Sequence, residues 1–228
     1  MKSKSTQISP RLYKALRFTF KLHGHDVRKE SEVPYLAHLL SVCAMVQHDG
    51  GDEDEAIAAL LHDALEDKPE ETNRDEIAEL FGEKVVKIIE ISTDTPPDYQ
   101  GGAKPPWRQR KEAYLAHVRS TDPGLMRVTV ADKVDNARAI LADYQRLGED
   151  FWKRFNAGKE DQLWYYESAV LAYGAAGYQG PLLEELRRLV TQIRSQSQAN
   201  NLYAGQLMAH FGETPESAEE WIRNMNKK

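Results

Sequence analysis

The chain has little of what marks several protein classes. Its 228 residues include one cysteine, Cys43, which cannot form an intrachain disulfide and suits a reducing compartment. No apolar run approaches the roughly 20 residues of a transmembrane helix, and no apolar stretch follows the basic start of the chain, as a secretory signal requires. We therefore expect a soluble, cytoplasmic protein that does not enter a membrane, with Cys43 buried as a structural thiol.

The chain also lacks a basic excess. It carries 30 lysine and arginine residues against 36 aspartate and glutamate residues, a formal net charge of −6. Surfaces that bind DNA or RNA usually show an excess of positive charge, so a nucleic-acid polymer is not an expected partner. A small nucleotide remains possible, because a metal ion and a few local cations suffice to hold its phosphates.

What the chain does have is helical periodicity almost throughout. Apolar residues recur at spacings of three and four, between proline, glycine and aspartate punctuation. The β-branched run at 85–91 could form a strand, but its spacing favours a helix. The pattern predicts an all-α fold, with helices over residues 10–22, 34–48, 52–67, 73–81, 83–91, 107–120, from 122 onward, and 161–175.

Gly177 and Gly180-Pro181 mark a clear break near the C-terminus. We expect residues 1–178 to form the main domain and residues 179–228 a C-terminal helical extension. That extension should hold two or three helices, the last starting at Thr214-Pro215.

The most informative stretch is LLHDALED, residues 60–67. His62 and Asp63 are adjacent, and Glu66 and Asp67 follow one helical turn later, so a continuous helix would place Glu66 near His62 and Asp67 near Asp63. These polar groups interrupt an otherwise apolar helix, where burying them without partners would be costly. A bound cation would offset that cost.

Two more metal-capable side chains, His38 and Asp132, lie on other apolar helices. Imidazole and carboxylate ligands together suit Mn²⁺, Fe²⁺ or Zn²⁺. A structural zinc site would normally use four cysteine or histidine ligands, so an open site with an activated water is the better interpretation.

Taken together and in order, these pieces resemble the HD superfamily of metal-dependent phosphohydrolases. The likeness is greatest to small alarmone hydrolases and to the hydrolase domain of Rel/Spo-type proteins, and it covers about residues 10 to 175. The matching segments are RK at 28–29, PYLAH at 34–38, ALLHDALED at 59–67, FG at 81–82 and ADKVDN at 131–136. The Glu-Asp pair makes H-D-x-x-E-D more specific than H-D alone.

The resemblance implies a Mn²⁺-dependent pyrophosphohydrolase that removes the 3′-diphosphate of (p)ppGpp or a related alarmone. It implies that Glu66 and Asp67 position and activate the attacking water. It also implies a metal ion, Mn²⁺ or alternatively Fe²⁺ or Zn²⁺, held by His38, His62, Asp63 and Asp132.

The same resemblance implies substrate contacts. Arg28 and Lys29 would border the base, Asn136 the ribose or a neighbouring phosphate, and Tyr165 the pocket wall. Where the family has a phosphate-binding lysine this chain has Trp107, and its later arginine falls near Asp161. The substitutes we expect are Lys104, Arg108, Arg110, Lys111, Arg154 and Lys159.

These departures leave the nucleotide open. Guanosine and adenosine alarmones, (p)ppGpp and (p)ppApp, are both candidates. The alternatives are another HD-type phosphohydrolase, acting on 5′-nucleotides, deoxynucleotides or NADPH, and a non-catalytic nucleotide-binding module. The Glu66-Asp67 pair argues against a 5′-nucleotidase or deoxynucleotide phosphohydrolase, and the complete ligand quartet argues against a binding module.

Overall fold

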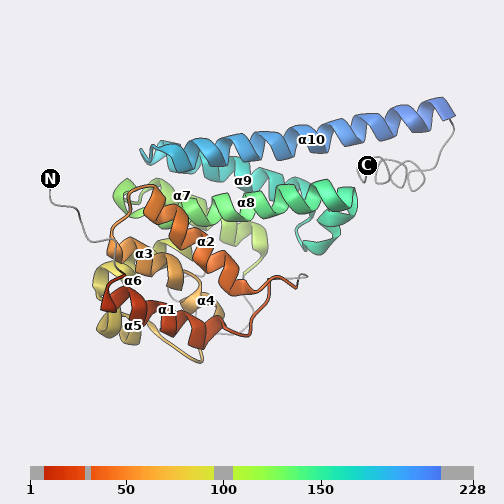
Figure 1. Cartoon of the computed structure of the whole chain (residues 1–228). Helices are drawn as coiled ribbons and strands as arrows, with labels where there is room; N and C mark the ends of the chain where they lie inside the picture. The colour runs from red at the N-terminus through yellow and green to blue at the C-terminus, as the bar shows by residue number, and fades with distance from the viewer. Residues whose placement is uncertain (1–7, 29–31, 95–104, 212–228) are drawn as a thin grey trace.

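The computed structural model describes residues 8–28, 32–94 and 105–211, and almost all of them lie in helices (Figure 1). Among the described residues, β pairing is limited to an isolated bridge between Val27 and Pro34. The elements are α1 Pro10–His23, α2 Tyr35–His48, α3 Glu53–Leu61, α4 Ala64–Asp67, α5 Arg74–Phe81, α6 Glu83–Ser92, α7 Trp107–Arg119, η1 Pro123–Leu125, α8 Arg127–Leu147, η2 Gly148–Arg154, α9 Gly158–Ala175 and α10 Pro181–Phe211.

Local signals in the sequence set the helix starts. Ser9 caps α1 by accepting from the backbone N–H of Leu12. Asp52 and Glu55 form a reciprocal capping box at the start of α3, and Asn73 caps α5. Such caps satisfy backbone donors that have no partner within the helix, so the predicted starts of these helices are confirmed.

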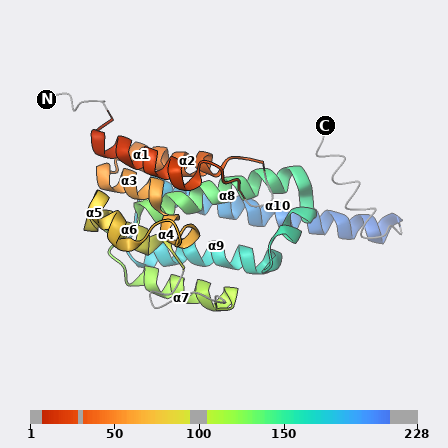
Figure 2. The same ribbon diagram turned by 90° about the horizontal axis from the view of Figure 1, so that it is seen from below.

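Helix α8 is the structural centre of the molecule. It contacts α2, α3 and α6 as well as α10 and η2. Figure 2 shows α1, α2 and α3 on one side of it and α9 and α7 on the other. Its buried residues include Asp132 and Lys133 among apolar neighbours, which places ionisable groups in the middle of the fold.

One expectation about helix boundaries is wrong. The helix predicted over residues 52–67 is broken at His62 and Asp63 into α3 and α4. After the Gly180-Pro181 break, the structure has one long helix from Pro181 to Phe211. The expected start of the last helix at Thr214-Pro215 lies outside the described residues, so the number of helices in the extension stays a prediction.

Helix α10 packs along α8 and α9 and then runs beyond the body of the molecule (Figures 1 and 2). Its N-terminal half buries a leucine-rich face in the same core as the rest of the chain. The division at residue 178 therefore stays a prediction. Of the described helices, none combines the length and apolarity needed to span a bilayer, and Cys43 is buried as expected.

Candidate active site

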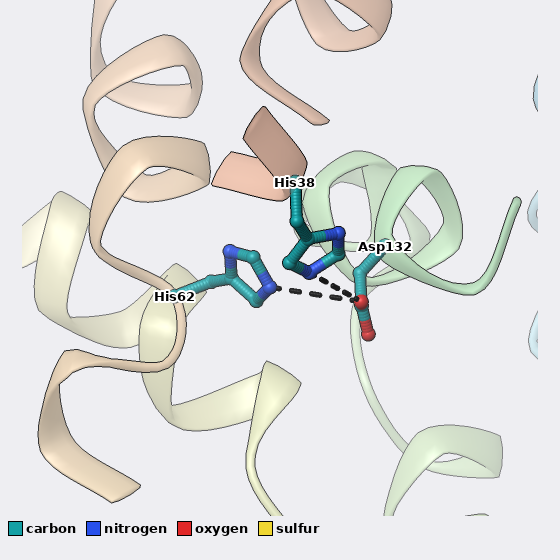
Figure 3. A group of neighbouring side chains, drawn as sticks. All are labelled: His38, His62 and Asp132. Carbon is teal, nitrogen blue, oxygen red and sulfur yellow. Dashed lines mark ion pairs between the residues drawn. The ribbon is translucent and has the colours of Figure 1, made fainter. Parts of the chain in front are cut away.

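Three separate segments bring the predicted metal ligands together: α2 supplies His38, the α3–α4 turn supplies His62 and Asp63, and α8 supplies Asp132. Asp132 Oδ1 lies 3.3 Å from His38 Nε2 and 3.6 Å from His62 Nε2 (Figure 3). Asp63 Oδ2 lies 3.1 Å from His62 Nε2 and 3.8 Å from His38 Nε2. Three residues of the predicted quartet, His38, His62 and Asp132, therefore converge on one point, and Asp63 lies beside both imidazoles.

The break between α3 and α4 explains how adjacent residues share that point. Neighbouring side chains on a regular helix are about 100° apart, so His62 and Asp63 could not both face one centre there. In the turn that replaces the helix, Asp63 shifts to φ −99° and ψ −3°. The backbone N–H groups of Glu66 and Asp67 then bond to the Asp63 carbonyl, which restarts the chain as α4.

Both imidazoles are held by their second ring nitrogen. His38 Nδ1 lies 2.7 Å from Asp135 Oδ2, and His62 Nδ1 lies 2.8 Å from the Ala59 carbonyl oxygen. A proton on each Nδ1 leaves each Nε2 with a lone pair aimed at the shared centre, the usual arrangement of metal-binding histidines. The buried His62 Nε2 finds no hydrogen-bond partner among the described residues.

A divalent ion fits this arrangement. Ligand atoms about 2.0 to 2.2 Å from a metal lie about 3 Å from one another, close to the separations above. In the protein alone, burial lowers the pKa of His62, but Asp63 and Asp132 outweigh it and raise that pKa well above its ordinary value. A cation supplies the same compensating charge while leaving His62 neutral, so these residues suit a metal ion.

His38, Asp63 and Asp132 line a cavity of about 240 Å³ with almost wholly polar walls, hereafter the polar cavity. Thr93 Oγ1 donates to Glu66 Oε2 over 2.8 Å, which fixes that carboxylate at the rim. The lining has two lysine ammonium groups, from Lys111 and Lys133. Against these stand five carboxylates, of Asp63, Glu66, Asp67, Asp94 and Asp132. This excess of negative charge would repel a phosphate unless a cation offset it.

Each of the two lysines contacts one of these carboxylates. Lys111 Nζ lies 2.6 Å from Asp94 Oδ2 and 4.5 Å from the Tyr165 ring centroid. Burial and the charge of Lys133 lower the pKa of Lys111, against the opposing effect of Asp94. Lys133 Nζ lies 2.5 Å from Asp132 Oδ2, and that contact raises the pKa of Lys133 well above its usual value despite burial.

A second cavity of about 260 Å³ adjoins the first and shares Tyr35 and Asn136 with it. Its walls are mostly apolar and aromatic, and we call it the aromatic cavity. Its other lining residues are Arg28, Ala139, Ile140, Asp143, Phe151, Arg154, Phe155 and Tyr166.

The structure places the predicted substrate residues in different settings. Tyr165 and Lys111 line the polar cavity, Arg28 and Arg154 line the aromatic cavity, and Asn136 lines both. Lys29 and Lys104 lie outside the described residues. Three others line neither cavity and are held in ion pairs: Arg108 with Asp161 and Glu112, Arg110 with Asp94, and Lys159 with Glu149.

Arg28 and Asn136 also belong to the hydrogen-bond network of the predicted metal ligands. Asn136 Nδ2 donates to Asp132 Oδ1, and Arg28 donates to Asn136 Oδ1, both over 2.5 Å. Arg28 also bonds to Asp135 over 2.8 Å, and Asp135 holds His38. The two residues therefore link the ligand set to the aromatic cavity.

Our sequence interpretation gave no role to four residues in this network. Asp135 holds His38, Tyr35 donates to Asp63 over 2.5 Å, and Lys133 and Asp94 line the polar cavity. Asp135 lies three residues after Asp132 on the same helix, so helical spacing could have pointed to it. Nothing in the sequence around Asp94 distinguishes it from other loop acids.

The family model for the HD domain matches residues 15–162 of this chain. The chain belongs to the HD domain family. The match contains His38, His62, Asp63 and Asp132 as well as Glu66 and Asp67.

Several proteins similar in sequence to this chain are named as hydrolases of one nucleotide. The chain is 29% identical over 184 residues to human guanosine-3′,5′-bis(diphosphate) 3′-pyrophosphohydrolase MESH1, covering 79% of this chain and 93% of that protein. It is 33% identical over 144 residues to MESH1 of Xenopus tropicalis, covering 62% and 73%. It is also 33% identical over 136 residues to the Aquifex aeolicus guanosine-3′,5′-bis(diphosphate) 3′-pyrophosphohydrolase, covering 59% of this chain but 18% of that longer protein.

Solved structures share the fold. One, described as a metazoan ortholog of SpoT that hydrolyses ppGpp, superposes with a TM-score of 0.65 at 20% identity, covering 82% of this chain and 98% of that one. A Listeria monocytogenes protein, lmo0812, superposes with a TM-score of 0.59 at 27% identity, covering 68% and 97%. Both confirm the all-α fold.

Proposed function

We propose that this protein is a metal-dependent hydrolase that removes the 3′-diphosphate from a purine alarmone, (p)ppGpp or (p)ppApp, and releases diphosphate. The observation that carries the proposal is the cluster of His38, His62, Asp63 and Asp132 beside a cavity that is also lined by Glu66 and Asp67. The names of the relatives support the substrate class.

In this proposal His38, His62, Asp63 and Asp132 hold a divalent ion, with Mn²⁺ expected and Fe²⁺ or Zn²⁺ as alternatives. A bound ion polarises a phosphoryl oxygen and lowers the pKa of water. The protein fixes the ligand orientation through Asp135 on His38 and the Ala59 carbonyl on His62.

Glu66 and Asp67 handle the proton. Glu66 Oε2 is fixed by Thr93, and its carboxylate faces the same cavity as the ligand quartet. A positioned carboxylate can orient a water molecule and accept its proton as the new P–O bond forms. The bond between phosphorus and the ribose 3′-oxygen breaks, and that oxygen takes up a proton from solvent as it leaves. Asp67, exposed at the rim, is placed to pass that proton to solvent.

Lys111 and Lys133 neutralise the phosphates. Both lysines line the same polar cavity as Glu66, where charge-assisted contacts to a diphosphate are strong. Lys111 lies one helical turn after Trp107, on the same face of α7. Lys111 therefore supplies, from the next turn of the helix, the positive charge that related proteins carry at the position of Trp107.

The test is phosphate chemistry followed by ³¹P NMR. The purified full-length protein is mixed with Mn²⁺ and, in separate reactions, ppGpp, ppApp, NADPH and deoxynucleoside 5′-monophosphates. The proposal expects diphosphate from at least one alarmone and none after chelation of the metal. Orthophosphate from NADPH or 5′-monophosphates, with both alarmones intact, would replace it with another phosphohydrolase activity. If every substrate stays unchanged, the proposed hydrolase activity is wrong and the non-catalytic nucleotide-binding module is the better interpretation.

A further inference from the structure

The two adjoining cavities differ in chemistry. The polar cavity is walled by carboxylates and lysines, which suit a metal ion and phosphates. The aromatic cavity is lined by Ile140, Phe151, Phe155 and Tyr166. Apolar and aromatic side chains of this kind can pack against a flat ring. If the scissile phosphate lies at the metal centre, the nucleobase has the aromatic cavity as its neighbouring compartment.

A row on α8 joins the two compartments. Asp132, Asn136, Ile140 and Asp143 follow one another at spacings of four, four and three residues, so they share one face of the helix. The row begins at a metal ligand and ends about 16 Å along the helix axis. Asp143 therefore stands at the end of the aromatic cavity far from the metal ligands.

Asp143 is paired there with Arg154, the other charged group at that end. Arg154 donates to Asp143 Oδ2 over 3.2 Å, and Arg146 donates to Oδ1 over 2.7 Å from outside the cavity lining. Each carboxylate oxygen accepts more than one hydrogen bond, so Asp143 keeps acceptor capacity toward the cavity. The wall thus presents an acceptor beside a donor.

A guanine edge matches this pattern. Guanine presents the O6 acceptor next to its N1–H and N2–H₂ donors, and arginine is a frequent partner of O6 and N7. The N1–H and N2–H₂ groups can both donate to one carboxylate. Hypoxanthine lacks the 2-amino group, and adenine replaces O6 with an amino group, so each forfeits part of this set.

We propose that Asp143 and Arg154 determine base specificity by binding the edge of guanine, with Asp143 accepting from N1–H and N2–H₂ and Arg154 donating to O6. This inference rests on the proposed function for the placement of the base. It adds selectivity for guanine over adenine, which the metal centre does not provide because it binds the phosphates.

The test separates base recognition from hydrolysis. Binding of guanosine, inosine and adenosine 5′-diphosphates, which lack a 3′-diphosphate, is measured by calorimetry on the full-length Mn²⁺-loaded protein. We expect the guanine nucleotide to bind about tenfold or more tightly than the hypoxanthine nucleotide, the effect of one charge-assisted hydrogen bond. Asp143→Asn should bring that ratio close to one.

Two further variants sharpen the result. Arg154→Gln should weaken guanine and hypoxanthine nucleotides alike, because both carry O6, and leave their ratio unchanged. Arg146→Ala, which removes an Asp143 partner outside the cavity, should leave the ratio unchanged too. Equal binding of the three nucleotides by the wild-type protein would overturn the inference, as would a guanine preference that survives Asp143→Asn.

Failure of the proposed function gives a different result. It is decided by diphosphate release from ppGpp or ppApp, whereas the inference is decided by the binding ratios. A protein that binds guanosine 5′-diphosphate selectively through Asp143 but leaves both alarmones intact would keep the base site and lose the proposed reaction.

Discussion

The metal centre and the basic segment at the start of α7 were both predicted from clustered polar residues, yet they are built differently. At the metal centre, His38, His62 and Asp132 are buried and point at one another (Figure 3). In the basic segment, Arg108 turns outward to Asp161 and stacks on Trp164, with its guanidinium carbon 3.2 Å from the ring centroid. Among the described cations of this segment, Lys111 alone lines the polar cavity as the sequence led us to expect.

A cluster of charged residues indicates a different function when it is buried than when it is exposed. Buried polar groups need compensation, so a convergent set of them indicates a ligand. Exposed cations find acids anywhere on the surface, and such pairs contribute little to stability. The comparison therefore predicts large effects at the metal centre and unequal, smaller effects among the α7 cations.

The largest effect is expected at His62. His62→Ala removes a ligand whose Nε2 has no other hydrogen-bond partner among the described residues, and it should abolish metal binding and activity together. Asp132→Asn, of nearly the same size, should do the same without leaving a cavity. Elemental analysis checks the metal, and His117→Ala, at an exposed histidine, serves as the control. Full occupancy in both ligand variants would refute the assignment.

The second effect concerns chemistry without loss of metal. Glu66→Gln keeps the size and the Thr93 contact but removes the proton acceptor, so turnover should fall about 10² to 10⁴-fold while metal content stays at the wild-type level. Steady-state kcat and elemental analysis are measured together. Glu70→Gln, at a neighbouring exposed position, should change neither. A near-normal kcat in Glu66→Gln would mean that another group accepts the proton.

The sequence predicted most of the helices because periodicity and capping are local. It also predicted that His38 and Asp132 share a site with His62, although they lie on separate helices, because each interrupts an apolar face. It did not predict the break at His62 and Asp63. The apolar pattern of α3 continues across that turn. The break in the helix brings His62 and Asp63 to one centre, and local helix propensity does not predict it.

The pairing of surface cations was beyond sequence reasoning for a different reason. Arg108 and Asp161 are 53 residues apart in the chain, and their contact depends on how α7 packs on α9. Asp135 is the opposite case. It lies within the ADKVDN segment, but its role depends on the side of His38 that it faces, which only the packing of α2 on α8 determines.

The third effect tests that supporting contact. Asp135 Oδ2 fixes His38 and also accepts from Arg28, while Oδ1 accepts from Ser41 over 2.5 Å. Loss of such a carboxylate partner typically costs about 10 to 100-fold in metal affinity. Asp135→Asn should therefore weaken Mn²⁺ binding by that factor in a metal titration and leave saturated activity largely recoverable at high Mn²⁺. Asp75→Asn, whose carboxylate is 95% exposed, should bind Mn²⁺ normally.

The smallest effect separates two cations of α7 that the sequence treated alike. Lys111 faces the polar cavity, and Lys111→Met removes a charge-assisted contact worth about 1.5 to 3 kcal/mol. Its KM for the alarmone should rise about tenfold or more. Arg108→Met removes an exposed cation already paired with Asp161 and Glu112, and its KM should stay within about twofold of the wild-type value, as for surface ion pairs of small energetic weight. Because the two residues sit one helical turn apart on α7, nonspecific loss of positive charge would raise both KM values equally. An equal rise in both KM values would show that the segment attracts substrate through its overall positive charge. The location of Lys111 in the cavity lining would then have no specific effect on binding.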